Sequence, residues 1–295
     1  MMKKILVTGG NGQLGSELQQ LAPLYAGFEF LFTDYAELPI DDEKAVFAFF
    51  REQNPSYCIN CAAYTAVDKA ETDQDMAMLV NGTSVGYLAK AAAENGARFI
   101  HISTDYVFDG EATEPISEET PVNPLGVYGL TKLKGEQLAV AYAPNAIIIR
   151  TAWVYSAYGH NFVKTMLRLM SERKELSVVN DQFGSPTYAA DLAKAILDII
   201  VILDQQPNVD QFGGIYHYSN DGVISWYDFA VAIRDLSGSK CKIHPIPTTA
   251  YPTPARRPAY SVLSKDKIRS VFGIRTIPWK DSLKACLLQL QQLLA

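Results

Sequence analysis

The sequence predicts an α/β protein with a Rossmann-type, doubly wound parallel sheet and a smaller mixed α/β substrate-binding domain. Three observations lead to this prediction. Short apolar segments alternate with helical patterns through the first half of the chain, a glycine-rich turn follows the first segment, and the alternation stops near residue 155. We therefore expect an NAD(P)-binding Rossmann domain over residues 1–155. Residues 156–295 should form mainly a substrate-binding domain, with some segments returning to the Rossmann domain.

Five segments of the first half have the length and the apolar content of buried strands. They are residues 4–8, 29–33, 57–62, 98–103 and 146–150. Between them, residues 42–53 and 76–95 show the apolar spacing of helices. Strand, helix and strand repeated in this order predict a parallel sheet covered on both faces, with nucleotide cofactors at the carboxyl ends of the strands.

The second half of the chain reads mainly as helices joined by loops that contain glycine and proline. Helical patterns cover residues 161–174, 188–203, 225–236 and 280–294, and residues 176–179 resemble a strand. Residues 245–254 contain four prolines, which predicts an extended loop.

Composition excludes several classes of function. The chain has 295 residues, 48% of them hydrophobic, and a net charge of −6, which argues against nucleic-acid binding. It has no apolar stretch of the roughly 18 residues that a membrane span needs, and no signal peptide, so a cytoplasmic location is expected. Cys58 and Cys61 form a C-x-x-C motif, but they lie in a predicted buried strand, and neither the cysteines nor the four histidines have metal-site spacing. We therefore expect no metal.

The glycine-rich turn lies directly after the first predicted strand and before a helix. Gly9, Gly12 and Gly15 permit a tight turn in which backbone N–H groups approach a pyrophosphate, as in dinucleotide-binding proteins. Asp34 ends the second predicted strand, about 20 residues further on, where an acidic residue binds the ribose of NAD. A basic residue nearby could still admit NADP, so the sequence predicts NADPH or NADH as the cofactor.

A tyrosine and a lysine four residues apart suggest proton chemistry. On a helix, Tyr128 and Lys132 lie on one face. A free phenol has a pKa of about 10, and a nearby ammonium group lowers it, which would suit a proton donor in a carbonyl reductase. Ser103 and Thr104 follow the fourth predicted strand, where a hydroxyl group could bind the same substrate oxygen. By itself the tyrosine–lysine pair would also fit an exposed helix face.

These features resemble the extended short-chain dehydrogenase/reductase superfamily. Within it the chain is similar to the dTDP-4-dehydrorhamnose reductases over almost its whole length. The similarity is carried by the segments TAVDKAE (65–71), STDYVFDG (103–110), VYGLTK (127–132), RTAWVY (150–155), NDQFGSPT (180–187) and PTTAYPTPARRP (247–258).

The resemblance implies a reaction and a set of site residues. NADPH or NADH would reduce the 4-keto group of the nucleotide sugar dTDP-4-dehydro-L-rhamnose, giving dTDP-L-rhamnose for polysaccharide biosynthesis. Tyr128 would donate the proton, Lys132 would tune it and hold the nicotinamide ribose, and Thr104 would bind the keto oxygen. The remaining implied contacts are Asp105 and Trp153 with the sugar, Gly12, Gln13 and Leu14 with the pyrophosphate, and Ala63, Tyr64 and Thr65 with the dinucleotide.

Several alternatives stay open at this stage. Trp153 could be a core residue, and Arg256 and Arg257 could clamp the substrate diphosphate or form a solvated pair. A nucleotide-sugar 4-epimerase or 4,6-dehydratase would use the same tyrosine and lysine, although a dehydratase should carry an acid pair after Thr104. A non-catalytic regulatory subunit would also keep the fold. Some relatives dimerise through Mg²⁺ held by glutamates, but only Glu17 fits that pattern, so a monomer or a homodimer without metal is expected.

Overall fold

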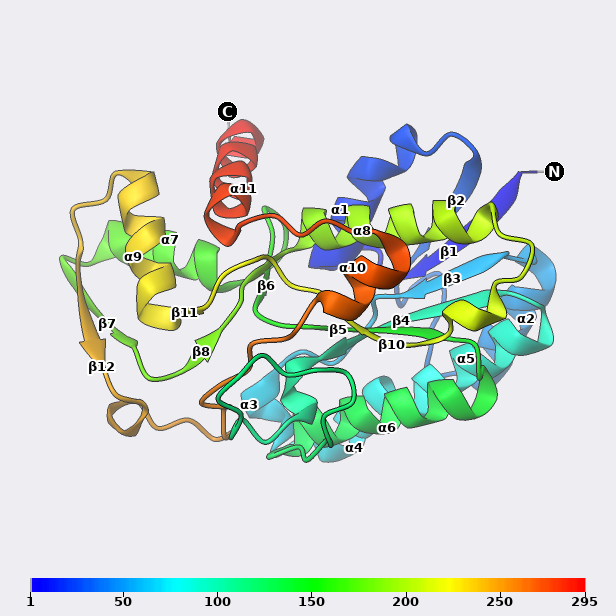
Figure 1. The fold of residues 1–295 in the computed structure, drawn as a ribbon, viewed down its shortest axis with the longest axis horizontal. Coiled ribbons are helices and arrows are strands. Elements are labelled where there is room, and N and C mark those ends of the chain that lie inside the picture. The colour runs from blue at the N-terminus through cyan, green and yellow to red at the C-terminus, as the bar shows by residue number, and fades with distance from the viewer. Residues whose placement is uncertain (1, 295) are drawn as a thin grey trace.

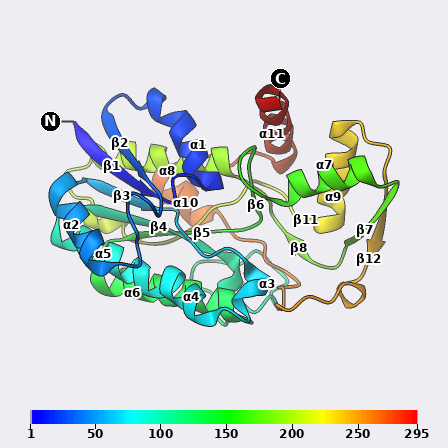
Figure 2. The same cartoon turned by 180° about the vertical axis from the view of Figure 1, so that it is seen from behind.

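A six-stranded, all-parallel sheet forms the centre of the protein. The structure is a computed structural model that describes residues 2–294 (Figures 1 and 2). The strands lie in the order β10-β5-β4-β3-β1-β2. Their bounds are β1 (Lys3–Thr8), β2 (Phe28–Thr33), β3 (Tyr57–Asn60), β4 (Arg98–Thr104), β5 (Ile147–Thr151) and β10 (Gly214–His217). This confirms the predicted Rossmann-type fold and all five predicted strands, to within two residues at each end.

Helices cover both faces of this sheet, which makes it doubly wound as predicted. One face packs against α1 (Gln13–Leu21), α8 (Ala189–Asp204) and α10 (Asp266–Phe272). The other face packs against α2 (Glu43–Gln53), α5 (Ser84–Glu94) and α6 (Val127–Tyr142). The order of the strands reverses between β1 and β3, so the carboxyl ends of these two strands border the crevice where such sheets bind ligands.

The predicted helix over residues 76–95 is built from three pieces. They are α4 (Gln74–Met78), a π-helical turn (Leu79–Thr83) and α5. The one-turn helix α3 (Val67–Ala70) precedes them. Short 3-10 helices occur at Ala22–Leu24, Asp105–Val107, Asp210–Phe212 and Thr248–Ala250.

A second hydrophobic core lies beside the sheet. Its helices are α7 (Phe162–Glu172), α9 (Trp226–Ser237) and α11 (Trp279–Leu294). Its strands pair as β7 (Glu175–Val179) with β12 (Lys242–Ile246), β8 (Phe183–Gly184) with β11 (Ile224–Ser225), and β6 (Val154–Tyr155) with β9 (Thr187–Tyr188). The four helical patterns predicted after residue 160 are confirmed. Of the predicted 245–254 loop, the first two residues belong to β12.

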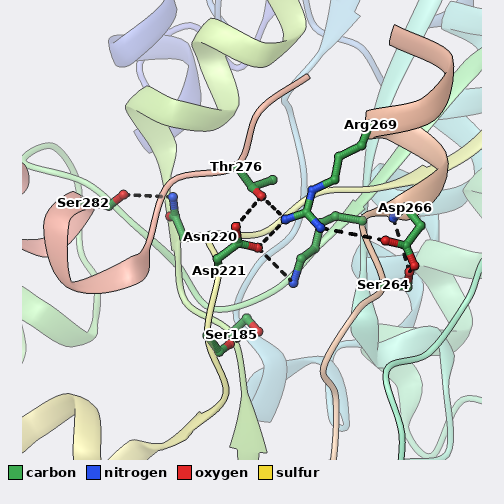
Figure 3. Close-up of polar contacts among 10 residues, drawn as sticks. Ser185, Asn220, Asp221, Ser264, Asp266, Arg269, Thr276 and Ser282 are labelled. Carbon is green, nitrogen blue, oxygen red and sulfur yellow. Dashed lines mark hydrogen bonds and ion pairs between the residues drawn. The ribbon is translucent and has the colours of Figure 1, made fainter. Parts of the chain in front are cut away.

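The chain passes between the two cores several times, because β10, α8 and α10 come from its second half. Figure 3 shows polar contacts at one such crossing. Asp221, between β10 and β11, accepts hydrogen bonds from Arg269 of α10 at 2.6 Å and from Thr276 at 2.7 Å. Its neighbour Asn220 is fully buried and donates to Ser282 of α11 at 2.9 Å. Over the described residues, no helix is both long and apolar enough to cross a membrane.

Candidate active site

The glycine-rich turn joins β1 to α1 at the carboxyl edge of the sheet. Gly9 has a φ of 67°, and a Cβ there would stand 2.7 Å from the backbone nitrogen of Ala62. A Cβ at Gly15 would stand 2.3 Å from the carbonyl oxygen of Gly9. Helix α1 starts after Gly12, which has no side chain to cap it. The first N–H groups of α1 are therefore available to bind a pyrophosphate, and the turn fits a dinucleotide.

The other predicted cofactor residues near the amino end lie around this turn. Leu14 is 7% exposed and packs in the core, so only its backbone N–H can meet a ligand. The Gln13 side chain accepts a hydrogen bond from Asn161 at 3.0 Å. Asp34 follows β2, and its carboxylate accepts a hydrogen bond from the backbone N–H of Asn11 at 3.1 Å. Asp34 therefore braces the turn, in the position that suits an adenosine ribose.

The segment Ala63, Tyr64 and Thr65 follows β3 on the same edge. The fully buried Asn81 holds it, since its Oδ1 accepts the N–H of Tyr64 at 2.8 Å and its Nδ2 donates to the carbonyl oxygen of Tyr64 at 3.0 Å. The same amide group also donates to Thr131 of α6 at 3.2 Å. Sequence reasoning missed Asn81, because one asparagine inside a helical pattern carries no signal.

Thr104 and Tyr128 meet where β4 ends. Thr104 is the last residue of β4, and Tyr128 is the second residue of α6. Burial raises the pKa of Tyr128, and the nearby Thr104 hydroxyl, which donates to Oδ1 of Asp105 at 3.1 Å, acts in the opposite direction. The ring of Tyr106 packs edge-on against Tyr128, with 5.4 Å between the ring centres. The structure thus brings together the hydroxyl and the phenol that the sequence predicted to share one substrate oxygen.

The pKa of Tyr128 differs from the sequence expectation. Burial, together with a smaller effect of the Asp105 charge, raises it to about 12, against the effect of Thr104. Lys132 is not among the groups that shift it. The Nζ of Lys132 donates instead to the carbonyl oxygen of Ile102 at 2.6 Å. At neutral pH Tyr128 is therefore a protonated phenol, the form that can donate a proton.

Lys132 lies one helical turn before Glu136, which forms a buried ion pair with Arg150. Sequence reasoning missed this pair. Burial lowers the pKa of Lys132 to about 8, and the negative charge of Glu136 opposes this shift. Glu136 is 3% exposed and bonds Arg150 of β5 through two contacts, of 2.6 and 2.9 Å. Ser103 also donates to Glu136, at 2.5 Å. The available signal was spacing, because Glu136 follows Lys132 by the same four residues that separate Lys132 from Tyr128.

A cavity of about 820 Å³ lies near this site, although none of Thr104, Tyr128 and Lys132 lines it. Leu125, three residues before Tyr128, lines it, together with residues 109–112, 181–183 and 251–257. Arg256 and Arg257 both belong to the lining, but they differ in their partners. Arg257 is paired with Asp68 at 2.7 Å. The Arg256 guanidinium has no hydrogen bond or ion pair with any side chain in the part of the chain that the structure describes.

Asp105 is the most deeply buried of the predicted sugar contacts. It is 2% exposed, and burial raises its pKa to about 6, although hydrogen bonds from Ser261 and Thr104 act in the opposite direction. Its Oδ2 has no hydrogen-bond partner among the described residues. Asp105 is therefore a buried polar group with one acceptor oxygen that no described residue satisfies.

Trp153 lies between the end of β5 and the second core. Its φ of 49° is unusual for a residue with a side chain, and such strain is concentrated at functional sites. Its ring stacks on Trp226 with 3.6 Å between ring centres and an interplanar angle of 12°. Gly184 lies directly beneath it, because a Cβ there would stand 2.7 Å from the ring. Trp153 is half-buried, so part of it can face a sugar.

Cys58, within β3, and Cys61, directly after it, are free thiols. Cys58 is fully buried, and burial raises the pKa of Cys61 to about 12, so both behave as small apolar residues. Residues 2–294 contain no group of three or more His, Cys, Asp or Glu side chains placed to hold a metal ion.

The parallel sheet, its glycine-rich first turn and the threonine, tyrosine and lysine at its carboxyl edge define an NAD(P)-dependent reductase of the extended short-chain dehydrogenase/reductase class. Comparison with known proteins narrows this class. The family model described as RmlD substrate binding domain matches residues 2–292. The dTDP-4-dehydrorhamnose reductase of Aggregatibacter actinomycetemcomitans is 42% identical over 289 residues, which is 96% of this chain and 98% of that protein.

Two solved structures agree with this result. The dTDP-4-dehydrorhamnose reductase of Clostridium acetobutylicum has a TM-score of 0.92 and 46% identity, and the match covers 98% of this chain and 99% of that one. The enzyme of Bacillus anthracis, solved in complex with NADP, has a TM-score of 0.92 and 37% identity over 98% of this chain and 100% of that one. The chain belongs to the dTDP-4-dehydrorhamnose reductase family.

Proposed function

We propose that this protein reduces the 4-keto group of dTDP-4-dehydro-L-rhamnose to a hydroxyl group, giving dTDP-L-rhamnose, with NADPH or NADH as the reductant. One observation carries the proposal within the family: Thr104 and Tyr128 meet at the edge of the sheet that also holds the glycine-rich turn. A ketone bound there would have a hydroxyl and a phenol at its oxygen and the dinucleotide at its carbon.

The bound cofactor supplies the hydride for C4 of the sugar. Tyr128 donates its proton to the keto oxygen, which completes the new hydroxyl group. Thr104 donates a hydrogen bond to the same oxygen and stabilises the negative charge that develops there. The ammonium group of Lys132 lies one turn along α6, donates to the carbonyl oxygen of Ile102, and would hold the nicotinamide ribose. Gly9, Gly12 and Gly15 keep the backbone open for the pyrophosphate.

The cavity beside this edge supports a nucleotide-sugar substrate. We assign the substrate diphosphate to Arg256, because its guanidinium lines the cavity without a protein partner, whereas Arg257 is already paired with Asp68. Asp105 and Trp153 would contact the sugar. The cytoplasmic location and the monomeric or homodimeric state stay predictions, and sedimentation of the purified protein tests the second.

The test is to mix the purified protein with dTDP-4-dehydro-L-rhamnose and to follow the absorbance of NADPH and of NADH. Loss of one reduced cofactor for each product formed is the expected result. Product without net loss of cofactor would instead indicate a 4-epimerase, and a complete lack of turnover would indicate a regulatory subunit. An Arg256→Gln variant should raise the KM for the nucleotide sugar and leave the KM for the cofactor unchanged.

A further inference from the structure

Helix α3 lies between the cavity and the catalytic helix α6. It follows the segment Ala63, Tyr64 and Thr65, it contains Asp68, and its C-cap residue is Glu71. Figures 1 and 2 both show the loop after β12 running beside α3. Helix α3 also packs against α6. One short element is therefore in contact with the two parts of the protein that would meet the substrate.

Asp68 holds the loop. Its Oδ1 accepts hydrogen bonds from the backbone N–H of Ala255 and from Nη1 of Arg257, both at 3.1 Å, and its Oδ2 accepts one from Nη2 of Arg257 at 2.7 Å. Such a fork between a guanidinium and a carboxylate fixes orientation as well as distance. Ala255 is 2% exposed, so this contact pins the centre of the segment 251–257 that lines the cavity.

Glu71 holds the start of the catalytic helix. Its Oε1 accepts a hydrogen bond from the backbone N–H of Val127, the first residue of α6, at 2.9 Å. The N-cap residue Gly126 cannot cap the helix itself, and a Cβ there would stand 2.6 Å from the Glu71 oxygen. Glu71 therefore supplies both the missing cap and a favourable negative charge at this helix terminus. Tyr128 is the next residue, so the cap fixes the backbone that carries the phenol.

We propose that α3 couples the substrate loop to the catalytic tyrosine. In this proposal Asp68 holds the 251–257 loop in the position where it lines the cavity, and Glu71 keeps the first turn of α6 in place. Both are positioning residues for the reduction. The inference rests on the proposed function. It predicts that loss of the Asp68 carboxylate changes mainly the KM for the nucleotide sugar, and that loss of the Glu71 carboxylate changes mainly kcat.

Removing each carboxylate should therefore have a distinct effect. Asp68→Asn weakens the fork and loosens the loop, so the KM for the nucleotide sugar should rise about tenfold with little change in kcat. Glu71→Ala removes the cap, so kcat should fall about tenfold while the KM for the sugar stays the same. Glu71→Gln keeps an oxygen that can accept from Val127, and it should restore most of the lost kcat.

A control variant tests whether weakening an Arg–Asp pair elsewhere in the protein also changes KM or kcat. Asp235→Asn weakens an exposed Arg–Asp pair near the end of α9, in which Nε and Nη2 of Arg234 donate to one oxygen of Asp235 at 2.8 and 2.7 Å. This variant should leave both constants unchanged. The dissociation constant for NADPH should be the same in all four variants, because none of them alters the glycine-rich turn.

Amide hydrogen exchange provides a readout that needs no turnover. In wild-type protein, addition of dTDP should slow exchange in residues 251–257 and also in residues 126–129. In Asp68→Asn the loop should exchange faster, and dTDP should no longer protect residues 126–129.

The kinetic and exchange results together decide the proposal. An unchanged KM in Asp68→Asn, a Glu71→Ala variant with normal kcat, or full protection of residues 126–129 in Asp68→Asn would overturn it. A wild-type protein that does not turn over the nucleotide sugar would count against the proposed function alone, because the exchange experiment would still decide whether α3 couples the two parts.

Discussion

Replacing Glu136 by glutamine tests the role of the buried ion pair beneath Lys132. Glu136 and Arg150 are 3% and 2% exposed, and two hydrogen bonds join them. The substitution leaves the Arg150 charge buried without its partner, while Nη1 of Arg150 already lacks a hydrogen bond among the described residues. Breaking one side of a buried pair costs about 3–5 kcal/mol of unfolding free energy. At about 2 °C for each kcal/mol, Tm should fall by roughly 6–10 °C.

The same substitution should change the pH dependence of the reaction. Burial holds the pKa of Lys132 at about 8, and Glu136 is the main group that opposes this shift. The other ionisable groups that interact with Lys132 are Cys61 at the end of β3 and His101 of β4. In wild type, kcat should fall as pH rises through about 8, where Lys132 loses its proton. Without the Glu136 charge the pKa of Lys132 decreases, so this fall should begin at lower pH.

The assay is a thermal melt together with kcat measured from pH 6 to pH 9.5. Glu172→Gln is the control, because it makes the same chemical change in an exposed pair with Arg168 and should shift Tm by only about 1 °C. The double variant Glu136→Gln, Arg150→Met removes both buried charges and should recover much of the stability, but not the original pH profile. A Glu136→Gln protein with the wild-type Tm and the wild-type pH profile would refute the reasoning.

Three further predictions concern single residues of the site. Tyr128→Phe should lower turnover by roughly 10²-fold or more and leave the dissociation constant for NADPH unchanged, and a near-normal rate would contradict its role as proton donor. Gly15→Ala should abolish NADPH binding in a fluorescence titration, because its Cβ would stand 2.3 Å from the Gly9 oxygen. Lys132→Met should lose activity but keep or raise Tm at pH 7, because it removes a buried ammonium whose pKa has been lowered to about 8, a shift that corresponds to about 3 kcal/mol. A marked decrease in Tm would contradict this last expectation.

Local sequence patterns were enough to predict the sheet and the cofactor turn. The strands are continuous apolar segments because helices cover both faces of the sheet, and the glycines of the turn stand where a Cβ would collide with the backbone. The sixth strand, β10, was missed. It has four residues, follows a short 3-10 helix and pairs only with β5, so its place in the sheet is set by tertiary contacts.

The sequence named candidate residues for the site, but it could not show all of their contacts. Spacing placed Tyr128 and Lys132 on one helix face, but it could not show that Lys132 donates to the carbonyl oxygen of Ile102. In the same way, Arg256 and Arg257 look equivalent in sequence. Only the fold brings Asp68, almost 190 residues earlier, against the second of them. Partners that are distant in sequence leave no local signal, and the missed residue Asn81, which bonds Tyr64 and Thr131, is of this kind.

The repeated crossing of the chain between its two cores limits how such a protein can be divided. A fragment that ended at residue 155 would lack β10, and it would expose the apolar surface that α8 and α10 now cover. Such a fragment should aggregate instead of folding as a free nucleotide-binding unit. Recombination at one boundary could therefore not exchange the second core as a unit. New sugar specificities in this fold would arise instead from changes within the 251–257 loop and its neighbours.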